Sequence, residues 1–390
     1  MTDQARLTLP LGIRRSDGLH PQVRARIAGN LAANALRHQR ALEVHGEWID
    51  RLKRHGIPFV FLKGLTHAPY FCHDPRYRQQ YDIDIYSPPG YTRNLLAVAI
   101  ALGYEPVNRG RETPTDHLPV MIRKTGWRWR GDYYDPEMPL HLEIHFQLWD
   151  REVERFDVAG TDEMWQRREP RLVSGIELPA FHLRDTFRYA AIHILRHLLR
   201  GSLCPGHLYE FAHFLHTSAC DDLFWSSWRR ASLSECLAEV LASNLALHCF
   251  GCSLNCAIQD LIAQLPPNLQ KWFDLFALSP LLNFETPNKD ELLLHLQLVS
   301  RPHMVPIAKR RLLPSFPSRF SRNPHTDQSG AFADHLALLA RRAVYHLRSV
   351  GTLARSGARW LWEAGDRVED TVASKNCSRA SQMSCWKRGS

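Results

Sequence analysis

Two carboxylates lie two residues apart in the short apolar segment 81–86, which reads YDIDIY. Alternate side chains of a β-strand share a face, so Asp82 and Asp84 would lie about 7 Å apart on one face. Ile83 and Ile85 would point the other way, into the core. Oxygen ligands held on one rigid strand suit a divalent cation. The segment therefore predicts the platform of a metal site.

A third carboxylate lies in the segment 140–146, LHLEIHF, which alternates in the same way. Its apolar residues would be buried, so His141, Glu143 and His145 would share the other face. Carboxylates on neighbouring strands could hold two metal ions about 3.5 to 4 Å apart, an arrangement that assists in-line attack on a phosphorus atom. One ion would lower the pKa of the attacking hydroxyl, and the other would bind a triphosphate. The predicted metal ligands and catalytic residues are Asp82, Asp84 and Glu143.

A basic residue and a glycine directly follow another buried strand candidate. The apolar run 59–62 leads into Lys63 and Gly64, and a short helix is predicted from there to about residue 72. A strand that runs into a helix presents backbone N–H groups to phosphates, and Lys63 would add a positive charge. Arg78, four residues before the first carboxylate, could neutralise triphosphate charge. Lys63, Gly64 and Arg78 are therefore predicted to bind the phosphates of a nucleotide.

Taken together, these motifs resemble the uncharacterised nucleotidyltransferase family of the polymerase-β superfamily. Members of that family show Lys-Gly after an apolar strand, then an Arg, and then Gly-Asp-Ile-Asp in another apolar strand. The matching stretches here are 61–64 (FLKG), 73–78 (HDPRYR) and 81–85 (YDIDI). The likeness continues with Leu-Gly-Tyr at 102–104 and Glu-Ile-His at 143–145, and more weakly with His193, His197, Glu210 and the segment 310–315.

The resemblance implies a reaction and leaves its acceptor open. It implies metal-dependent transfer of a nucleoside monophosphate, AMP from ATP by default, with release of pyrophosphate. The expected cofactor is Mg²⁺, with two ions. The expected partners are the nucleoside triphosphate and an acceptor that could be a small molecule, a peptide or a protein. Two residues depart from the family pattern: Tyr81 replaces a usual Gly, where it would crowd the nucleotide or stack on it, and Glu210 replaces a usual Asp.

Cysteine and histidine clusters offer other metal sites. The segment 248–256, HCFGCSLNC, contains four potential zinc ligands but lacks a distant second pair. We therefore expect Cys249, Cys252 and Cys256 to be reduced and free of metal. His193 and His197 are one helical turn apart, so they could bind a metal or simply pack between helices.

Basic residues are concentrated in the last quarter of the chain. From residue 300 onward there are 16 Lys and Arg against 6 Asp and Glu, whereas residues 1–299 have 33 against 34. The group formed by Lys309, Arg310 and Arg311 could contact nucleic acid or an acidic partner, and a solvated basic surface is the alternative. A further alternative for the whole protein is a catalytically silent member of the same fold that binds a nucleotide or a partner.

The remaining residues must build the elements that position these groups. Strand, helix and strand patterns alternate before residue 160 and helical patterns dominate after it, which predicts an α+β fold with a mixed sheet followed by a mostly helical region. The resemblance implies that this sheet is the polymerase-β-like nucleotidyltransferase sheet. The predicted strands are 57–62, 81–86, 118–123, 127–133 and 140–148, and the predicted helices include one or two over 20–56, one over 88–103 and one over 331–362. The predicted organisation is a helical lead (1–56), the catalytic core (57–160), a helical domain (161–300), a basic linker with a C-terminal helix (301–373) and a disordered tail (374–390).

Composition bounds the class of protein. The chain has 390 residues, of which 44% are hydrophobic, enough for sizeable cores. No apolar run approaches the roughly 20 residues that a membrane helix needs, and the N-terminus lacks the order of a signal peptide. Nine dispersed cysteines do not form the dense pattern of a disulfide scaffold. We therefore expect a protein of the cytoplasm with no membrane partner.

Overall fold

Five short strands form one mixed sheet in the computed structural model, which describes residues 18–107, 116–228, 232–283, 286–313, 340–341 and 343–361. The strands are β1 (Val60–Leu62), β2 (Asp82–Tyr86), β3 (Tyr104–Pro106), β4 (Met121–Arg123) and β5 (His141–His145). Their order across the sheet is β1-β2-β5-β4-β3, and β2 and β5 run parallel while the other pairs are antiparallel. The predicted α+β class is confirmed.

The strand predictions needed correction in places. The predicted strand 127–133 is wrong, because these residues form a loop. There Trp127 donates a hydrogen bond to Asp135 over 2.9 Å, and Trp129 packs edge-on against Tyr133. The alternation of aromatic residues reflects these local contacts rather than a pairing with a strand. Strand β3 was not predicted, since its three residues are too few to show a pattern.

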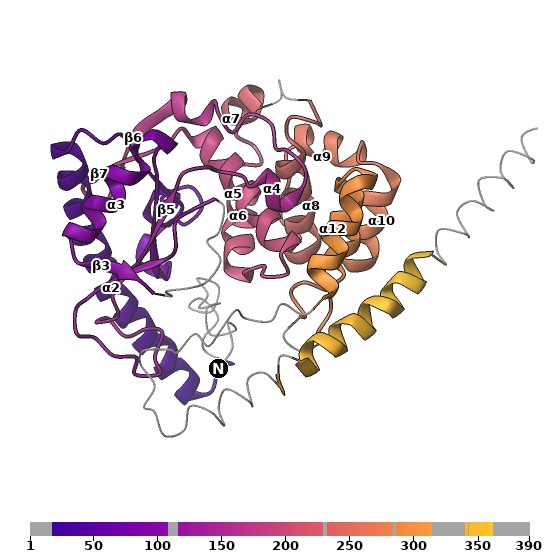
Figure 1. Ribbon diagram of the computed structural model, residues 1–390, viewed down its shortest axis with the longest axis horizontal. Coiled ribbons are helices and arrows are strands. Elements are labelled where there is room, and N and C mark those ends of the chain that lie inside the picture. Colours follow the sequence, from indigo (N-terminus) through magenta and orange to yellow (C-terminus); the bar gives the residue numbers. More distant parts are fainter. Residues whose placement is uncertain are drawn as a thin grey trace, which may run out of the picture.

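Helices α2 (Pro21–Arg54) and α3 (Thr92–Ala101) cover one face of the sheet (Figure 1). The predicted helical lead is a single helix, which begins with Pro21 in its first turn. Buried residues recur every three or four positions along its second half, and Trp48 and Leu52 are fully buried. They pack with Ile83 and Ile85, so this face carries the apolar side chains of β2.

A β-hairpin interrupts the predicted helical region. Strands β6 (Arg168–Val173) and β7 (Ile176–Phe181) pair antiparallel through a two-residue turn. Ser174 and Gly175 in this turn both have positive φ, 48° and 85°, as a type I′ turn requires. The prediction that the chain is helical beyond residue 161 is therefore wrong here. Pro170 and Pro179 obscured the strand pattern, because proline inside an apolar run argues against a strand.

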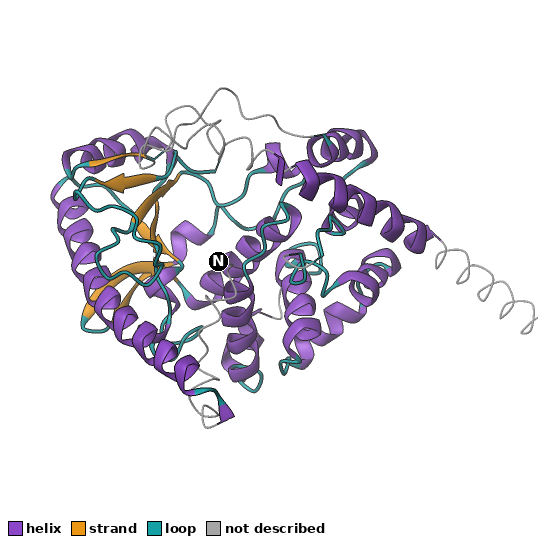
Figure 2. Ribbon diagram, turned by 90° about the horizontal axis from the view of Figure 1, so that it is seen from below, coloured by secondary structure: helices purple, strands orange, loops and turns teal. Residues whose placement is uncertain are grey.

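The second face of the sheet is covered by α5 (Leu183–Leu199). The sheet and the helical region lie side by side (Figure 2). Val60 and Leu62 of β1 belong to the same hydrophobic core as Ile192 and Leu195 of α5, so the two regions share a core. The other helices of this region are α6 (Pro205–Thr217), α7 (Asp222–Trp228), α8 (Leu237–Phe250), α9 (Cys256–Ala263), α10 (Pro267–Phe276) and α11 (Glu291–Leu298). The short elements are α4 (Arg151–Glu154) and the 3-10 helices η3 (Gly64–His67), η4 (Pro75–Tyr77), η5 (Pro89–Tyr91) and η6 (Met164–Arg167).

The start of the predicted basic linker is a helix, α12 (Arg301–Leu312). Its buried Ile307 packs in a small core, and Arg310 lies 3.7 Å from Glu154 of α4, so these contacts hold the helix although it contains Pro306. A last helical segment spans residues 343–361, within the predicted C-terminal helix (Figure 1, yellow). The predicted tail, 374–390, lies outside the described residues. Among the described helices, none combines the length and apolar character of a membrane span.

Candidate active site

The pairing of β2 with β5 brings the predicted carboxylates onto adjoining strands. In the parallel register, Asp82 lies beside His141 and Asp84 lies beside Glu143. The side chains of Ile83 and Ile85 are fully buried in the α2 side of the sheet, so the carboxylates occupy the other face. We call this surface, formed by Asp82, Asp84, His141, Glu143 and His145, the carboxylate face.

The tightest group of metal-ligating atoms on this face includes a histidine. One side-chain atom each of Asp84, Glu143 and His145 lies within 4.8 Å of the other two. His145 Nε2 is 3.2 Å from Asp84 Oδ1 and 3.5 Å from Glu143 Oε2. No other cluster of this kind occurs in the part of the chain that the structure describes. Sequence reasoning placed His145 on this face but gave it no role, and its position two residues after Glu143 on the alternating strand was the available signal.

Lys63 reaches the carboxylate face from the end of β1. Leu62 pairs with Asp84 in the antiparallel β1–β2 register, so Lys63 is the next residue. Its Nζ lies 3.0 Å from Asp84 Oδ1 and 3.1 Å from His193 Nε2 of α5. The side chain is 7% exposed. The structure therefore places Lys63 as the direct counter-ion of Asp84.

Gly64 permits the sharp turn that follows. Lys63 and Gly64 both have positive φ, 53° and 55°, a conformation that glycine adopts without strain. A Cβ atom on Gly64 would lie 2.6 Å from Nε2 of Gln80. The turn leads into the four-residue 3-10 helix η3, and turns follow as far as residue 71, so the predicted helix to about residue 72 is wrong. The residues of η3 are buried, and this segment is not an open helix N-terminus for phosphates.

Arg78 lies in a neighbouring buried ion pair rather than against the carboxylates. Its Nε is 2.8 Å from Glu210 Oε1 of α6, and Glu210 Oε2 is 3.0 Å from His67 Nδ1. Burial raises the pKa of Glu210, but the charge of Arg78 and the hydrogen bond from His67 outweigh it and lower that pKa to about 2. Arg78 also interacts electrostatically with Asp82, so its charge acts on the carboxylate face at longer range.

The three carboxyl groups differ in acidity. Burial and the charge of Asp84 raise the pKa of Asp82 to about 7. Burial also raises the pKa of Asp84, yet Lys63 and the hydrogen bond from His145 bring it below its ordinary value. The pKa of Glu143 is lowered as well, because the His145 hydrogen bond and the Lys63 charge exceed the effect of burial. Asp84 and Glu143 are therefore ionised at neutral pH and Asp82 only in part.

His193 of α5 contacts Lys63, and two further histidines of the helical region lie beside His193. His193 Nε2 lies 3.1 Å from Lys63 Nζ and 3.1 Å from His197 Nε2, and the ring of His207 lies 4.8 Å from that of His193. An ammonium group only donates, so His193 accepts through Nε2 and carries its proton on Nδ1. His197 Nδ1 lies 3.0 Å from the Ser202 hydroxyl. His193 thus orients Lys63, a role that the helix spacing alone did not indicate.

Tyr81, the residue in place of the usual glycine, packs on the opposite side of the sheet. The guanidinium of Arg37, from α2, lies 5.5 Å from the centre of its ring, and Tyr133 packs against it edge-on at 6.0 Å. Helix α2 covers the face that carries Ile83. The Tyr81 ring therefore lies away from the carboxylate face, where the sequence had suggested that it would crowd or stack on a nucleotide.

The other candidate features have structural partners. Arg311 pairs with Glu291, and Arg310 donates to the carbonyl oxygen of Val153, so two members of the predicted basic cluster are engaged inside the protein. Burial raises the pKa of the Cys249 thiol to about 12 and that of Cys252 to about 11. That Cys249, Cys252 and Cys256 are free of metal stays a prediction.

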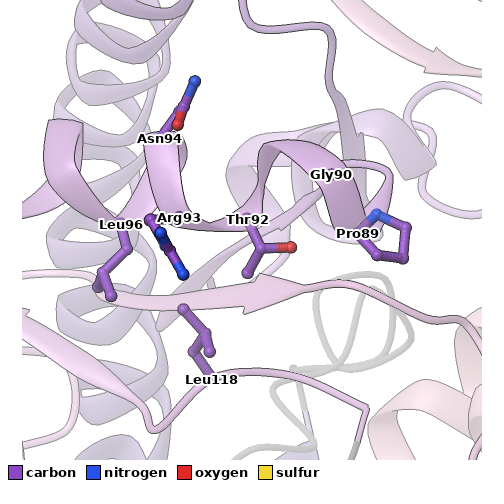
Figure 3. Close-up of a pocket in the computed structure, with 7 residues that line it drawn as sticks. All are labelled: Pro89, Gly90, Thr92, Arg93, Asn94, Leu96 and Leu118. Carbon is purple, nitrogen blue, oxygen red and sulfur yellow. The ribbon is translucent and has the colours of Figure 1, made fainter.

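A surface hollow lies at the start of α3, apart from the carboxylates (Figure 3). Helix α3 covers the apolar face of the sheet through Leu95 and Val98. The residues that line the hollow are Pro89, Gly90, Thr92, Arg93, Asn94, Leu96 and Leu118. None of these belongs to the carboxylate face, so the hollow is not the site described above.

Comparison with known proteins gives one result for the chain as a whole. A family model described as uncharacterised nucleotidyltransferase matches residues 8–251, which is more than half of the chain. The matched range contains the five-stranded sheet, the carboxylate face and α5 to α8. The searches found no significant match among curated proteins or among solved structures.

Proposed function

Because the chain belongs to the family of uncharacterised nucleotidyltransferases, we propose that it transfers a nucleoside monophosphate, AMP from ATP in the first instance, to an acceptor and releases pyrophosphate. The observation that carries this proposal is the register of β2 and β5, which sets Asp84 beside Glu143 with Lys63 at 3.0 Å from Asp84. An oxygen of the acceptor would attack the α-phosphorus, and the bond from that phosphorus to the bridging oxygen of the leaving pyrophosphate would break.

The carboxylate face fits a divalent cation, since ligand atoms of Asp84, Glu143 and His145 lie within 4.8 Å of one another, and Asp82 lies two residues before Asp84 on β2. Asp82, Asp84 and Glu143 would hold the metal, with Mg²⁺ as the expected ion. When bound, a metal at such a site lowers the pKa of the attacking hydroxyl and offsets the charge of the triphosphate.

The basic residues have separate parts in this proposal. Lys63 would exchange part of its contact with Asp84 for a phosphate oxygen, and His193 would keep the ammonium directed at the face. Arg78, held by Glu210, would add positive charge without direct contact. Gly64 would keep the turn beside Gln80 tight.

A catalytically silent nucleotide-binding protein is the second candidate. Its support from the sequence was Tyr81, and this ring packs against Arg37 on the far side of the sheet. The retention of two ionised carboxylates beside Lys63 supports catalysis instead.

The proposal is tested with ATP labelled on either its α- or its γ-phosphorus, incubated with Mg²⁺ and fractionated pools of small molecules, peptides and proteins. We expect the α-label to enter an acceptor and the γ-label to appear only in pyrophosphate. Transfer of the γ-label to the acceptor would show a kinase instead, and retention of both labels in nucleotide with every pool would favour the silent alternative.

A further inference from the structure

His145 contacts two carboxylates of the carboxylate face through one nitrogen atom. Its imidazole is 2% exposed, and Nε2 lies 3.2 Å from an oxygen of Asp84 and 3.5 Å from an oxygen of Glu143. One nitrogen atom thus faces a carboxylate oxygen from each of two neighbouring strands. The same three atoms could instead be the ligands of one metal ion.

The spacing of the three atoms is that of ligands around one metal ion. Metal–ligand distances of about 2.0 to 2.2 Å and angles of roughly 90° to 110° place neighbouring ligand atoms about 3.0 to 3.5 Å apart. The two distances from His145 Nε2, 3.2 and 3.5 Å, lie within this range. All three atoms come from β2 and β5, whose register is fixed by the sheet.

We propose that His145 is a metal ligand together with Asp84 and Glu143, and that this donor set selects a divalent transition-metal ion such as Mn²⁺ over Mg²⁺. Carboxylate oxygens bind both ions, whereas an imidazole nitrogen favours the transition metal. The inference rests on the proposed function, because it names the metal of the same site. A histidine that only positioned Asp84 would form no bond to the ion.

The bond between His145 and the metal can be detected directly in the full-length protein. Pulsed electron paramagnetic resonance of bound Mn²⁺ detects a coordinated imidazole through its ¹⁴N coupling. We expect this coupling with and without a non-hydrolysable ATP analogue, and its replacement by ¹⁵N coupling in protein labelled with [¹⁵N]histidine, which excludes the adenine ring as its source. Bound Mn²⁺ without histidine coupling, or no bound Mn²⁺ in either condition, would overturn the proposal.

Substitution of single histidines identifies which one coordinates the Mn²⁺. His145→Gln should lose the coupling and weaken Mn²⁺ binding about tenfold or more while changing Mg²⁺ binding less than about threefold. The matched control is His38→Gln, a buried histidine of α2, which covers the opposite face of the sheet, and it should keep both affinities. Coupling and Mn²⁺ preference that persist in His145→Gln would contradict the assignment, and if this variant does not fold, the labelled wild-type spectrum decides.

The test of His145 as a metal ligand can fail or succeed independently of the test of nucleotidyl transfer. Histidine-bound Mn²⁺ in a protein that transfers no nucleotide would contradict the function and leave the ligand assignment intact. Nucleotidyl transfer by a protein whose Mn²⁺ shows no histidine coupling would contradict the assignment alone.

Discussion

Two aspartates of the same strand have different surroundings at the carboxylate face. Asp84 is 3% exposed and contacts Lys63 and His145, whereas Asp82 is half-buried. The pKa of Asp82 is raised to about 7, and that of Asp84 is lowered. Asp84 therefore neutralises the buried ammonium of Lys63 in addition to any role with metal. A bound cation would favour the ionised form of Asp82.

This difference predicts different results for the two Asp→Asn variants. Asp82→Asn should reduce transfer at least about 100-fold with little change in the free energy of unfolding, because the carboxyl is already partly protonated. Asp84→Asn should also cost about 3 to 5 kcal/mol of stability, since Lys63 would stay buried without a charged partner. Urea denaturation and transfer from α-labelled ATP measure both effects. Equal free energies of unfolding for the two variants would show that Asp84 does not stabilise the buried charge of Lys63.

At the residue scale, the sequence predicted what local periodicity determines. Alternation correctly placed Asp82 and Asp84 opposite Ile83, because the side-chain period of a strand is fixed by its backbone. The contact between Lys63 and His193 joins residues 130 positions apart, and depends on how α5 packs on the sheet. No local pattern contains that information.

At the scale of elements, Arg78 and Glu210 connect the loop before β2 to α6. Their side chains are 8% and 15% exposed, and the atoms are 2.8 Å apart. Replacing one partner leaves the other charge buried and uncompensated. This pair therefore tests how firmly the sheet is joined to the helical region.

We predict that Arg78→Met lowers the free energy of unfolding by about 3 to 5 kcal/mol. The Arg78→Met, Glu210→Met double variant should lose clearly less than the sum of the single variants, because both charges are removed together. The control is the exposed pair of Arg40 and Glu137, where Arg40→Met should cost less than about 1 kcal/mol. Additive losses in the buried pair, measured by urea denaturation, would contradict the prediction.

Helix α2 carries a buried histidine that makes stability depend on pH. His45 donates through Nδ1 to the carbonyl oxygen of Ala41 over 2.6 Å and packs against Phe61. Burial lowers its pKa to about 4, with the hydrogen bond acting in the opposite direction. The unfolded chain, with an ordinary histidine pKa of about 6.5, therefore takes up this proton first as the pH falls.

The contribution of His45 is complete above about pH 6.5 and is lost as the pH falls towards 4, by up to about 3 kcal/mol. His45→Leu should accordingly lose less stability between pH 7.5 and pH 4.5 than the wild-type protein does. His55→Leu, at the exposed end of the same helix, is the control and should follow the wild type. Parallel curves for His45→Leu and wild type in urea titrations at several pH values would show that folding does not lower the pKa of His45.

Elements with a clear apolar period were predicted, whereas elements that depend on tertiary contacts were missed. The two central strands and α2 were identified because each has a clear apolar period. The hairpin of β6 and β7 was missed because of its prolines, and α12 was read as a linker because its arginines and prolines hide one buried residue, Ile307. Its ion pairs with α4 and α11 stabilise it, and these are tertiary contacts.

At the scale of the whole molecule, the catalytic sheet and the helices form one structure. The core that contains Val60 and Leu62 continues through α5, α6 and α8, so it crosses the predicted boundary at residue 160. A buried charge network adds to it: Arg196 pairs with Asp116, and Arg200 lies 2.6 Å from Glu154. The helical region therefore supports the carboxylate face directly, through the same helix that orients Lys63.

The central claim is that the carboxylate face binds a nucleoside triphosphate and a divalent metal together. Carboxylates repel a triphosphate without metal, and the metal reverses this by bridging the two. A ligand at about 100 times its dissociation constant stabilises the folded protein by roughly 2.7 kcal/mol, which raises the melting temperature by at least about one or two degrees in a chain of this size.

The most direct measurement is the melting temperature with ATP, with Mg²⁺ or Mn²⁺, and with both. We predict a clear rise with ATP and metal together and little with either alone. Glu143→Gln should abolish this synergy, and Glu177→Gln, an exposed carboxylate on β7, should retain it. An equal rise with ATP in EDTA, or full synergy in Glu143→Gln, would contradict the assignment of this face as the site of nucleotidyl transfer.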